Sequence, residues 1–282
     1  MNEIQSSQDM FFSVIINYGL YLVGISIFFT WLVRTSLGTE SLTNSVPRRT
    51  NMPIYLPFVP LLIWFGFSLI VIGISEKIWP ELPDWASTLI NNLAMCTGAT
   101  AAFVITLRLV RKHFSRRIKG LGLDVKTIPK DLGFAILNLL SVWPILLCIL
   151  LVTVYIGRFF SPDFEIQQHS QLEKISQHSQ IYVKILIFIT TTTIMPLIEE
   201  LLFRGLFQTI IRSITSKPWL SITLVSLLFT SIHVNAEHWP ALFVLSMCLG
   251  YSYEKSGSLF RPMFIHIIFN TSSVITVMMQ SG

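Results

Sequence analysis

Six polar side chains with chemical potential fall inside apolar stretches in the last third of this chain. They are Glu199, Glu200 and Arg204 in TTTIMPLIEELLFRG, His233 at the end of FTSIH, and His266 and Asn270 at the two ends of HIIFN. A charged side chain near the centre of a bilayer costs about 2.5–3.5 kcal/mol on insertion scales, so such residues face a protein interior or a water-filled cavity. Their presence in apolar stretches therefore needs a reason.

Carboxylates, imidazoles and an amide can together hydrolyse an amide bond without a nucleophilic Ser or Cys. A Glu can act as the general base that activates water, and a His can hold that water. A second His with an Asn can donate hydrogen bonds to the oxyanion of a tetrahedral intermediate. The residue types therefore favour hydrolytic chemistry inside a membrane.

A purely structural interpretation uses the same charges. Glu200 and Arg204 are spaced i,i+4, which allows an ion pair along one helix face. With Glu199 they would form a buried network that holds one helix in a bundle. On a regular helix Glu199 points about 100° away from Glu200, so we expect that the two carboxylates need not share a partner.

The three segments EELLFRG, FTSIH and HIIFN match the motifs EExxxR, FxxxH and HxxxN, in that order. In this combination the sequence resembles the CAAX protease and bacteriocin-processing (CPBP) family of intramembrane proteases, which includes the type II CAAX prenyl endopeptidases. The resemblance covers about 181–275. Each motif alone is weak, but all three in order on apolar segments are specific.

The resemblance implies a role for each matching residue. Glu199 would activate water, with His233 positioning it, and His266 and Asn270 would stabilise the oxyanion. The supporting residues would be Glu200, which could share in catalysis, Arg204 and Phe229.

A metal-dependent version of this hypothesis stays open. Glu199, His233 and His266 could form a zinc site with an open position for water. The sequence has no HExxH helix, in which one short motif supplies ligands and base, so we expect no cofactor, with zinc as the alternative. Cys96, Cys148 and Cys248 have no metal-ligand spacing and are expected to be small apolar residues rather than disulfides.

The composition predicts the elements that must position these residues. Only 12% of the 282 residues are charged and 52% are hydrophobic, against about 25% charged in an average soluble domain. A membrane-spanning helix needs about 20 mostly apolar residues. The sequence predicts an all-α, polytopic membrane helix bundle with about eight transmembrane helices (seven or nine are the alternatives), at about 11–33, 54–75, 86–107, 133–157, 181–211, 219–234, 239–253 and 260–279. Pro196 predicts a kinked or two-part fifth helix, with the Thr190–Thr193 run taking up the backbone groups that the proline frees.

The basic residues predict the topology. Fifteen of the 20 Lys and Arg residues lie in the odd-numbered connections, above all in the basic loop 108–130. By the positive-inside rule these connections are cytoplasmic and both termini lie outside. The same loop suits anionic lipid headgroups better than nucleic acid.

The sequence divides into two parts. Residues 1–170 form a variable N-terminal region of about four transmembrane helices, and 181–280 form the catalytic core. We expect a multi-pass protein of a bacterial cell membrane that acts on a membrane-associated peptide or protein, with prenylated substrates as one candidate. The alternatives are a non-catalytic immunity or scaffold protein that uses the polar cluster for binding, and a transporter with a proton relay, for which no inverted repeat is visible.

Overall fold

The computed structural model describes residues 2–47, 49–167, 174–175 and 177–280, and this part of the chain is a bundle of helices. Eight helical segments of 14 residues or more cover the apolar stretches expected from the sequence. They are α1 (Asn2–Arg34), α2 (Phe58–Ile78), α3 (Asp84–His113), α4 (Ile128–Phe160), a composite segment (Ile181–Thr215), α9 (Pro218–Ser231), α10 (Trp239–Ser256) and α11 (Phe260–Gln280). The all-α prediction is confirmed.

Length and hydropathy show a multi-pass membrane protein. Within the described ranges, five helical stretches are long and apolar enough to cross a bilayer, and two shorter apolar helices, Tyr18–Arg34 and Pro218–Ser231, accompany them. The α10 helix, expected as the seventh span, is in neither group. Its polar residues Ser246, Ser252 and Glu254 are buried against other helices, and they lower its hydropathy.

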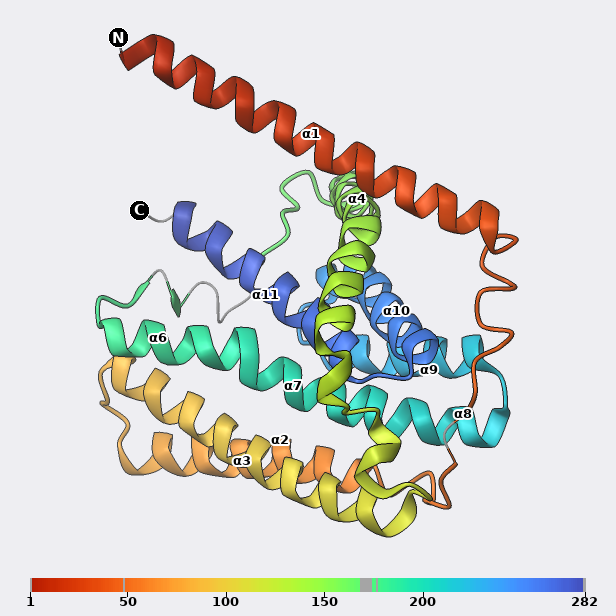
Figure 1. Cartoon of the computed structure of the whole chain (residues 1–282). Helices are drawn as coiled ribbons and strands as arrows, with labels where there is room; N and C mark the ends of the chain where they lie inside the picture. Colours follow the sequence, from red (N-terminus) through yellow and green to blue (C-terminus); the bar gives the residue numbers. More distant parts are fainter. Residues whose placement is uncertain (1, 48, 168–173, 176, 281–282) are drawn as a thin grey trace.

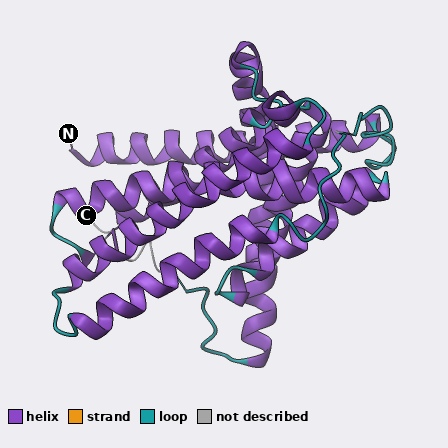
Figure 2. Ribbon diagram, turned by 90° about the horizontal axis from the view of Figure 1, so that it is seen from below, coloured by secondary structure: helices purple, strands orange, loops and turns teal. Residues whose placement is uncertain are grey.

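The helices pack in layers around the composite segment. Figure 1 shows α2 and α3 side by side below this segment, with α4, α10 and α11 above it. The α4 helix packs against α1, α10 and α11, so it joins the N-terminal part of the chain to the C-terminal helices. Figure 2 shows loops confined to the helix ends in the same part of the chain.

One buried ion pair holds α4 against the start of α11. Arg261 Nη2 lies 3.0 Å from Asp131 Oδ1, and both side chains are almost fully buried. The guanidinium of Arg261 also lies over the ring of Phe134, 4.6 Å from its centroid. This pair fixes the end of α11 from which the helix continues to His266.

The composite segment is continuous but not regularly α-helical. It contains α6 (Ile181–Ile189), the π-helix η3 (Thr190–Ile194), α7 (Met195–Glu200), the π-helix η4 (Leu201–Gln208) and α8 (Thr209–Thr215). Pro196 is accommodated by the wider π-helical turn before it rather than by a break. π-helical turns occur mostly as single turns within α-helices, frequently at functional sites.

Candidate active site

The three sequence motifs meet where α7 and η4 contact α9, α10 and α11. The α7 helix ends with Glu199 and Glu200, and Arg204 follows in η4. Phe229 lies in α9 and His233 just beyond its end, while His266 lies in α11. The structure thus brings together side chains that are up to 67 residues apart, as the motif pattern predicts.

Glu200 is the buried centre of this cluster. Its side chain is 0% exposed, and its Oε1 accepts hydrogen bonds from Arg204 Nη1 and from His266 Nδ1, both at 2.8 Å. The guanidinium and the imidazole N–H offset part of the cost of burying this carboxylate, whose Oε2 has no hydrogen-bond partner among the described residues. The expected Glu200–Arg204 pair is therefore present, and it also orients His266.

Glu199 lies on the other side of the same imidazole. Its Oε2 is 3.6 Å from His266 Nε2, and its side chain is 16% exposed. The two carboxylates therefore share His266, which the regular helical spacing of about 100° did not indicate. Of the two acids, Glu199 is the one whose side chain is partly exposed.

The ring of Phe229 packs against the charged residues and both histidines. Its centroid is 4.9 Å from the guanidinium carbon of Arg204, a cation–π contact. Its ring also lies 4.7 Å from the His233 ring and 6.0 Å from the His266 ring, between centroids. Phe229 is fully buried, so it supports the site by packing.

His233 has a defined tautomer in this arrangement. Its Nδ1 lies 2.7 Å from the carbonyl oxygen of Phe229, so the Nδ1–H donates to that carbonyl. The Nε2 atom is then left as an acceptor. Trp239 Nε1 donates to the carbonyl of His233 at 2.8 Å and ties its backbone to the start of α10.

Asn270 contacts the backbone of η3 rather than the carboxylates. Its Nδ2 donates to the carbonyl of Thr191 at 2.9 Å. The N–H of Met195 bonds to the carbonyl of Thr190, five residues back. The next partner in this π-helical pattern would be the N–H of residue 196, which proline lacks. Asn270 therefore satisfies the carbonyl that Pro196 leaves free, a task that the sequence suggested for the threonine hydroxyls.

Ser246 is a site residue that the sequence analysis missed. Arg204 Nη2 donates to its Oγ at 2.8 Å and to its carbonyl at 3.2 Å. Ser246 is fully buried on α10. A lone serine in an apolar helix gives no signal of its own, because its partner comes from another helix.

The described residues contain no assembled ligand set for the zinc alternative. Among the residues that the structure describes, no three His, Cys, Asp or Glu side chains gather closely enough to hold a metal ion. His233 contacts the Phe229 ring and carbonyl rather than Glu199. The three cysteines, Cys96, Cys148 and Cys248, are free.

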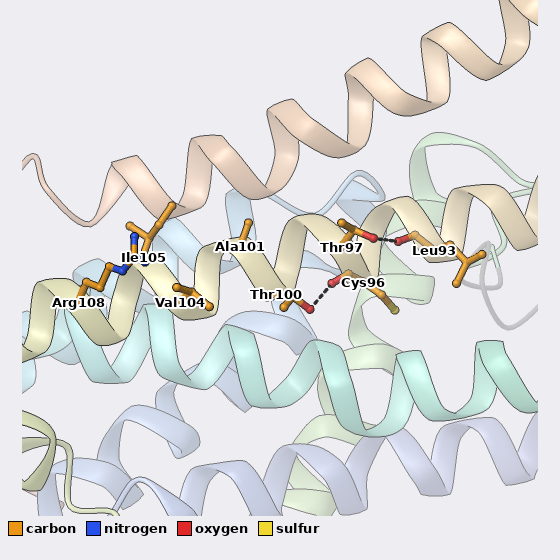
Figure 3. Close-up of a pocket in the computed structure, with 8 residues that line it drawn as sticks. All are labelled: Leu93, Cys96, Thr97, Thr100, Ala101, Val104, Ile105 and Arg108. Carbon is orange, nitrogen blue, oxygen red and sulfur yellow. Dashed lines mark hydrogen bonds between the residues drawn. The ribbon is translucent and has the colours of Figure 1, made fainter.

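Two hollows in the structure lie outside this cluster. A groove of about 660 Å³ lies along α3, lined by residues between Leu93 and Arg108. Figure 3 shows these residues, with Thr97 and Thr100 bonded to the backbone of their own helix. A cavity of about 330 Å³ lies between α1, α4, α9 and α10. Neither is lined by a residue of the three motifs.

Comparison with known families agrees with this geometry. Residues 181–272 match the family model of type II CAAX prenyl endopeptidase Rce1-like proteins. The C-terminal third of the chain is therefore similar to these proteins, and we call residues 181–272 the Rce1-like region. The matched range of this CAAX protease family contains the composite segment, α9, α10 and the first half of α11, and hence every residue of the cluster. No curated protein and no solved structure matches the chain.

The unequal burial of the two acids in the Rce1-like region gives a stability prediction. Glu200→Ala leaves the guanidinium of Arg204 buried without its carboxylate, and we expect a loss of about 3–5 kcal/mol. Glu199→Ala removes a partly exposed carboxylate with a longer contact and should cost much less. Thermal unfolding of the purified variants in detergent measures the difference. Equal losses for the two variants would contradict the assignment of Glu200 as the buried partner.

Proposed function

We propose that this protein is an intramembrane endopeptidase that hydrolyses a peptide bond of a membrane-associated peptide or protein with water activated by Glu199. The Rce1-like match supports protease activity in general. The finer assignment rests on the different exposure of the two carboxylates that contact His266. Glu200, which contacts Nδ1, is fully buried, and Glu199, which lies near Nε2, is partly exposed.

In the proposed reaction Glu199 accepts a proton from water, and the water oxygen attacks the carbonyl carbon of the scissile bond. A tetrahedral oxyanion forms, the C–N bond then breaks, and Glu199 returns the proton to the leaving amine. One water is consumed, and a carboxyl and an amino group are produced. The neutral His233 supplies Nε2 as an acceptor that helps to orient the water.

The oxyanion requires hydrogen-bond donors. When His266 carries both ring protons, its Nδ1–H donates to Glu200 and its Nε2–H is directed to the side on which Glu199 lies. Asn270 Nδ2 carries a second hydrogen besides the one that it donates to the carbonyl of Thr191. We therefore keep both residues as oxyanion donors in the proposal and add a structural task for Asn270.

Two features of the substrate are inferred from the apolar helices and the family match rather than from the site residues. The bilayer setting favours a membrane-associated peptide or protein, and the family supports a prenylated one as a candidate.

The runner-up function is a non-catalytic immunity or scaffold protein. The arrangement speaks against it, since a binding surface has no need of an accessible carboxylate beside an oriented imidazole.

The enzyme hypothesis predicts that Glu199→Gln and His233→Ala insert and fold but lose cleavage, by roughly 10²–10⁴-fold for the base. The assay follows release of product from prenylated and unmodified fluorescent peptides in liposomes. Glu81→Gln and His113→Ala, which lie outside the Rce1-like region, serve as matched controls and should retain activity.

Equal cleavage by wild type and both site variants, or no cleavage by wild type, would sink the enzyme hypothesis. The same assay separates the metal-free mechanism from the zinc version. Activity should survive a chelator that removes zinc, and a loss that zinc alone restores would establish the metal-dependent alternative.

We also propose that the protein lies in a bacterial cell membrane with both termini outside and the basic loop 108–130 in the cytoplasm. The excess of Lys and Arg in the odd-numbered connections supports this orientation. Cysteines introduced at Lys126 and Asp163 should react differently with a membrane-impermeant maleimide in intact cells. Labelling of the Asp163 position alone is expected, and labelling of the Lys126 position alone would reverse the topology.

A further inference from the structure

Three polar contacts join the segment that carries Arg204 to α10, and together they form a ladder. Arg204 donates to Ser246, Gln208 Nε2 donates to the carbonyl of Gly250 at 2.9 Å, and Arg212 Nε donates to Glu254 Oε1 at 2.8 Å. The partners in each contact are 42 residues apart. Since successive contacts advance by one turn on both helices, the two helices run in the same direction with a fixed register. We call these three contacts the polar ladder.

The polar ladder is buried along its whole length. Gln208 is 1% exposed, and Arg212 and Glu254 are also buried. Because lipid chains are as apolar as the side chains, there is no hydrophobic driving force between membrane helices, and packing and interhelical hydrogen bonds hold them together. Buried hydrogen bonds have no alternative partner in hydrocarbon. The ladder is therefore the feature that selects one register of η4 and α8 on α10.

The middle contact brings the side chain of Gln208 against the backbone of α10. A Cβ atom added at Gly250 would lie 2.9 Å from Gln208 Oε1 and 2.9 Å from Ile222 Cγ2. Residue 250 is therefore a glycine because the amide of Gln208 and the α9 side chain approach its backbone closely. Gln208 is also the last residue of the π-helix η4, the segment that holds Arg204.

We propose that Gln208 is a positioning residue for the catalytic cluster. By its bond to Gly250 it fixes η4 on α10, and so places Arg204 against Ser246 and Glu200. Glu200 in turn holds His266 through its Nδ1. The inference rests on the proposed peptidase function for its activity readout, but the placement of His266 can be measured without it.

The test compares Gln208→Leu with Ser252→Ala in the full-length protein. Leu keeps most of the side-chain volume and removes the amide. Ser252 is equally buried on α10 but bonds only to its own helix, at Leu249, so it reports any general cost of a buried change there. Gln208→Leu should lower kcat about fivefold and leave KM within about twofold, since one buried hydrogen bond of about 1 kcal/mol is at stake. Ser252→Ala should change neither.

A second variant and a second readout keep the test independent of folding and of activity. Gly250→Ala approaches the same contact from α10 and should give the same split of kcat and KM. Combined with Gln208→Leu it should add little, because both changes break one contact. The imidazole resonances of ¹⁵N-labelled histidine in detergent, with the His266 signals assigned by their loss in His266→Gln, should shift in Gln208→Leu and stay in place in Ser252→Ala.

The outcomes separate the two proposals. A wild-type protein that cleaves no peptide defeats the proposed function, and the His266 resonances then decide the role of Gln208 alone. Unchanged kcat and unchanged resonances in Gln208→Leu overturn the positioning role. Equal losses of kcat in Gln208→Leu and Ser252→Ala, in step with their unfolding temperatures, also overturn it.

Discussion

The ion pair between Glu200 and Arg204 is the constraint on which the rest of the Rce1-like region depends. Both side chains are 0% exposed in a part of the chain that crosses a membrane. Neither charge is exposed to solvent, and other helices meet part of the remaining hydrogen-bonding capacity of the pair. Among the described residues, Glu200 Oε2 and Arg204 Nε have no hydrogen-bond partner. The α10 helix supplies Ser246, α9 supplies the ring of Phe229, and α11 supplies His266. Each of these contacts brings one helix to the pair, and their convergence defines the packing of the C-terminal region.

This convergence gives the two neighbouring acids different surroundings. Glu200 uses Oε1 for both Arg204 and His266, and it is closed off from solvent. Glu199, one residue earlier, remains accessible next to the opposite nitrogen of the same ring. A general base needs contact with water, and an orienting acid needs a fixed partner. In the proposed mechanism Glu199 takes the first task and Glu200 the second, and both contact the imidazole of His266.

Most of the helices and the identity of the cluster could be predicted from the sequence. Long apolar runs form helices in a bilayer. The spacing of the three motifs identified the six polar residues and Phe229 as the members of the cluster. The shared contact of Glu199 and Glu200 with His266 could not be predicted. The expected directions of the two side chains assumed a regular α-helix, and the segment is interrupted by two π-helical stretches.

The partner of Asn270 and the second partner of Arg204 could not be predicted from the sequence. Thr191 offers a backbone carbonyl and Ser246 a single hydroxyl, and neither residue type stands out in its helix. Gln208 continues the spacing of four residues from Glu200 and Arg204, a signal that could have been noticed. Its partner is the backbone of Gly250, however, and a backbone acceptor leaves no trace in the sequence.

The central claim is that Glu200 and Arg204 serve catalysis by holding His266, and not only by stabilising the bundle. It is tested most directly by the double variant Glu200→Leu, Arg204→Leu, measured for unfolding temperature and for peptide cleavage in liposomes. Apolar replacement of a buried ion pair is often neutral or stabilising, so the double variant should unfold near the wild-type temperature. His266 then has no acceptor for its Nδ1–H, and cleavage should fall at least about 100-fold. A stable double variant that cleaves as fast as the wild type would contradict the account.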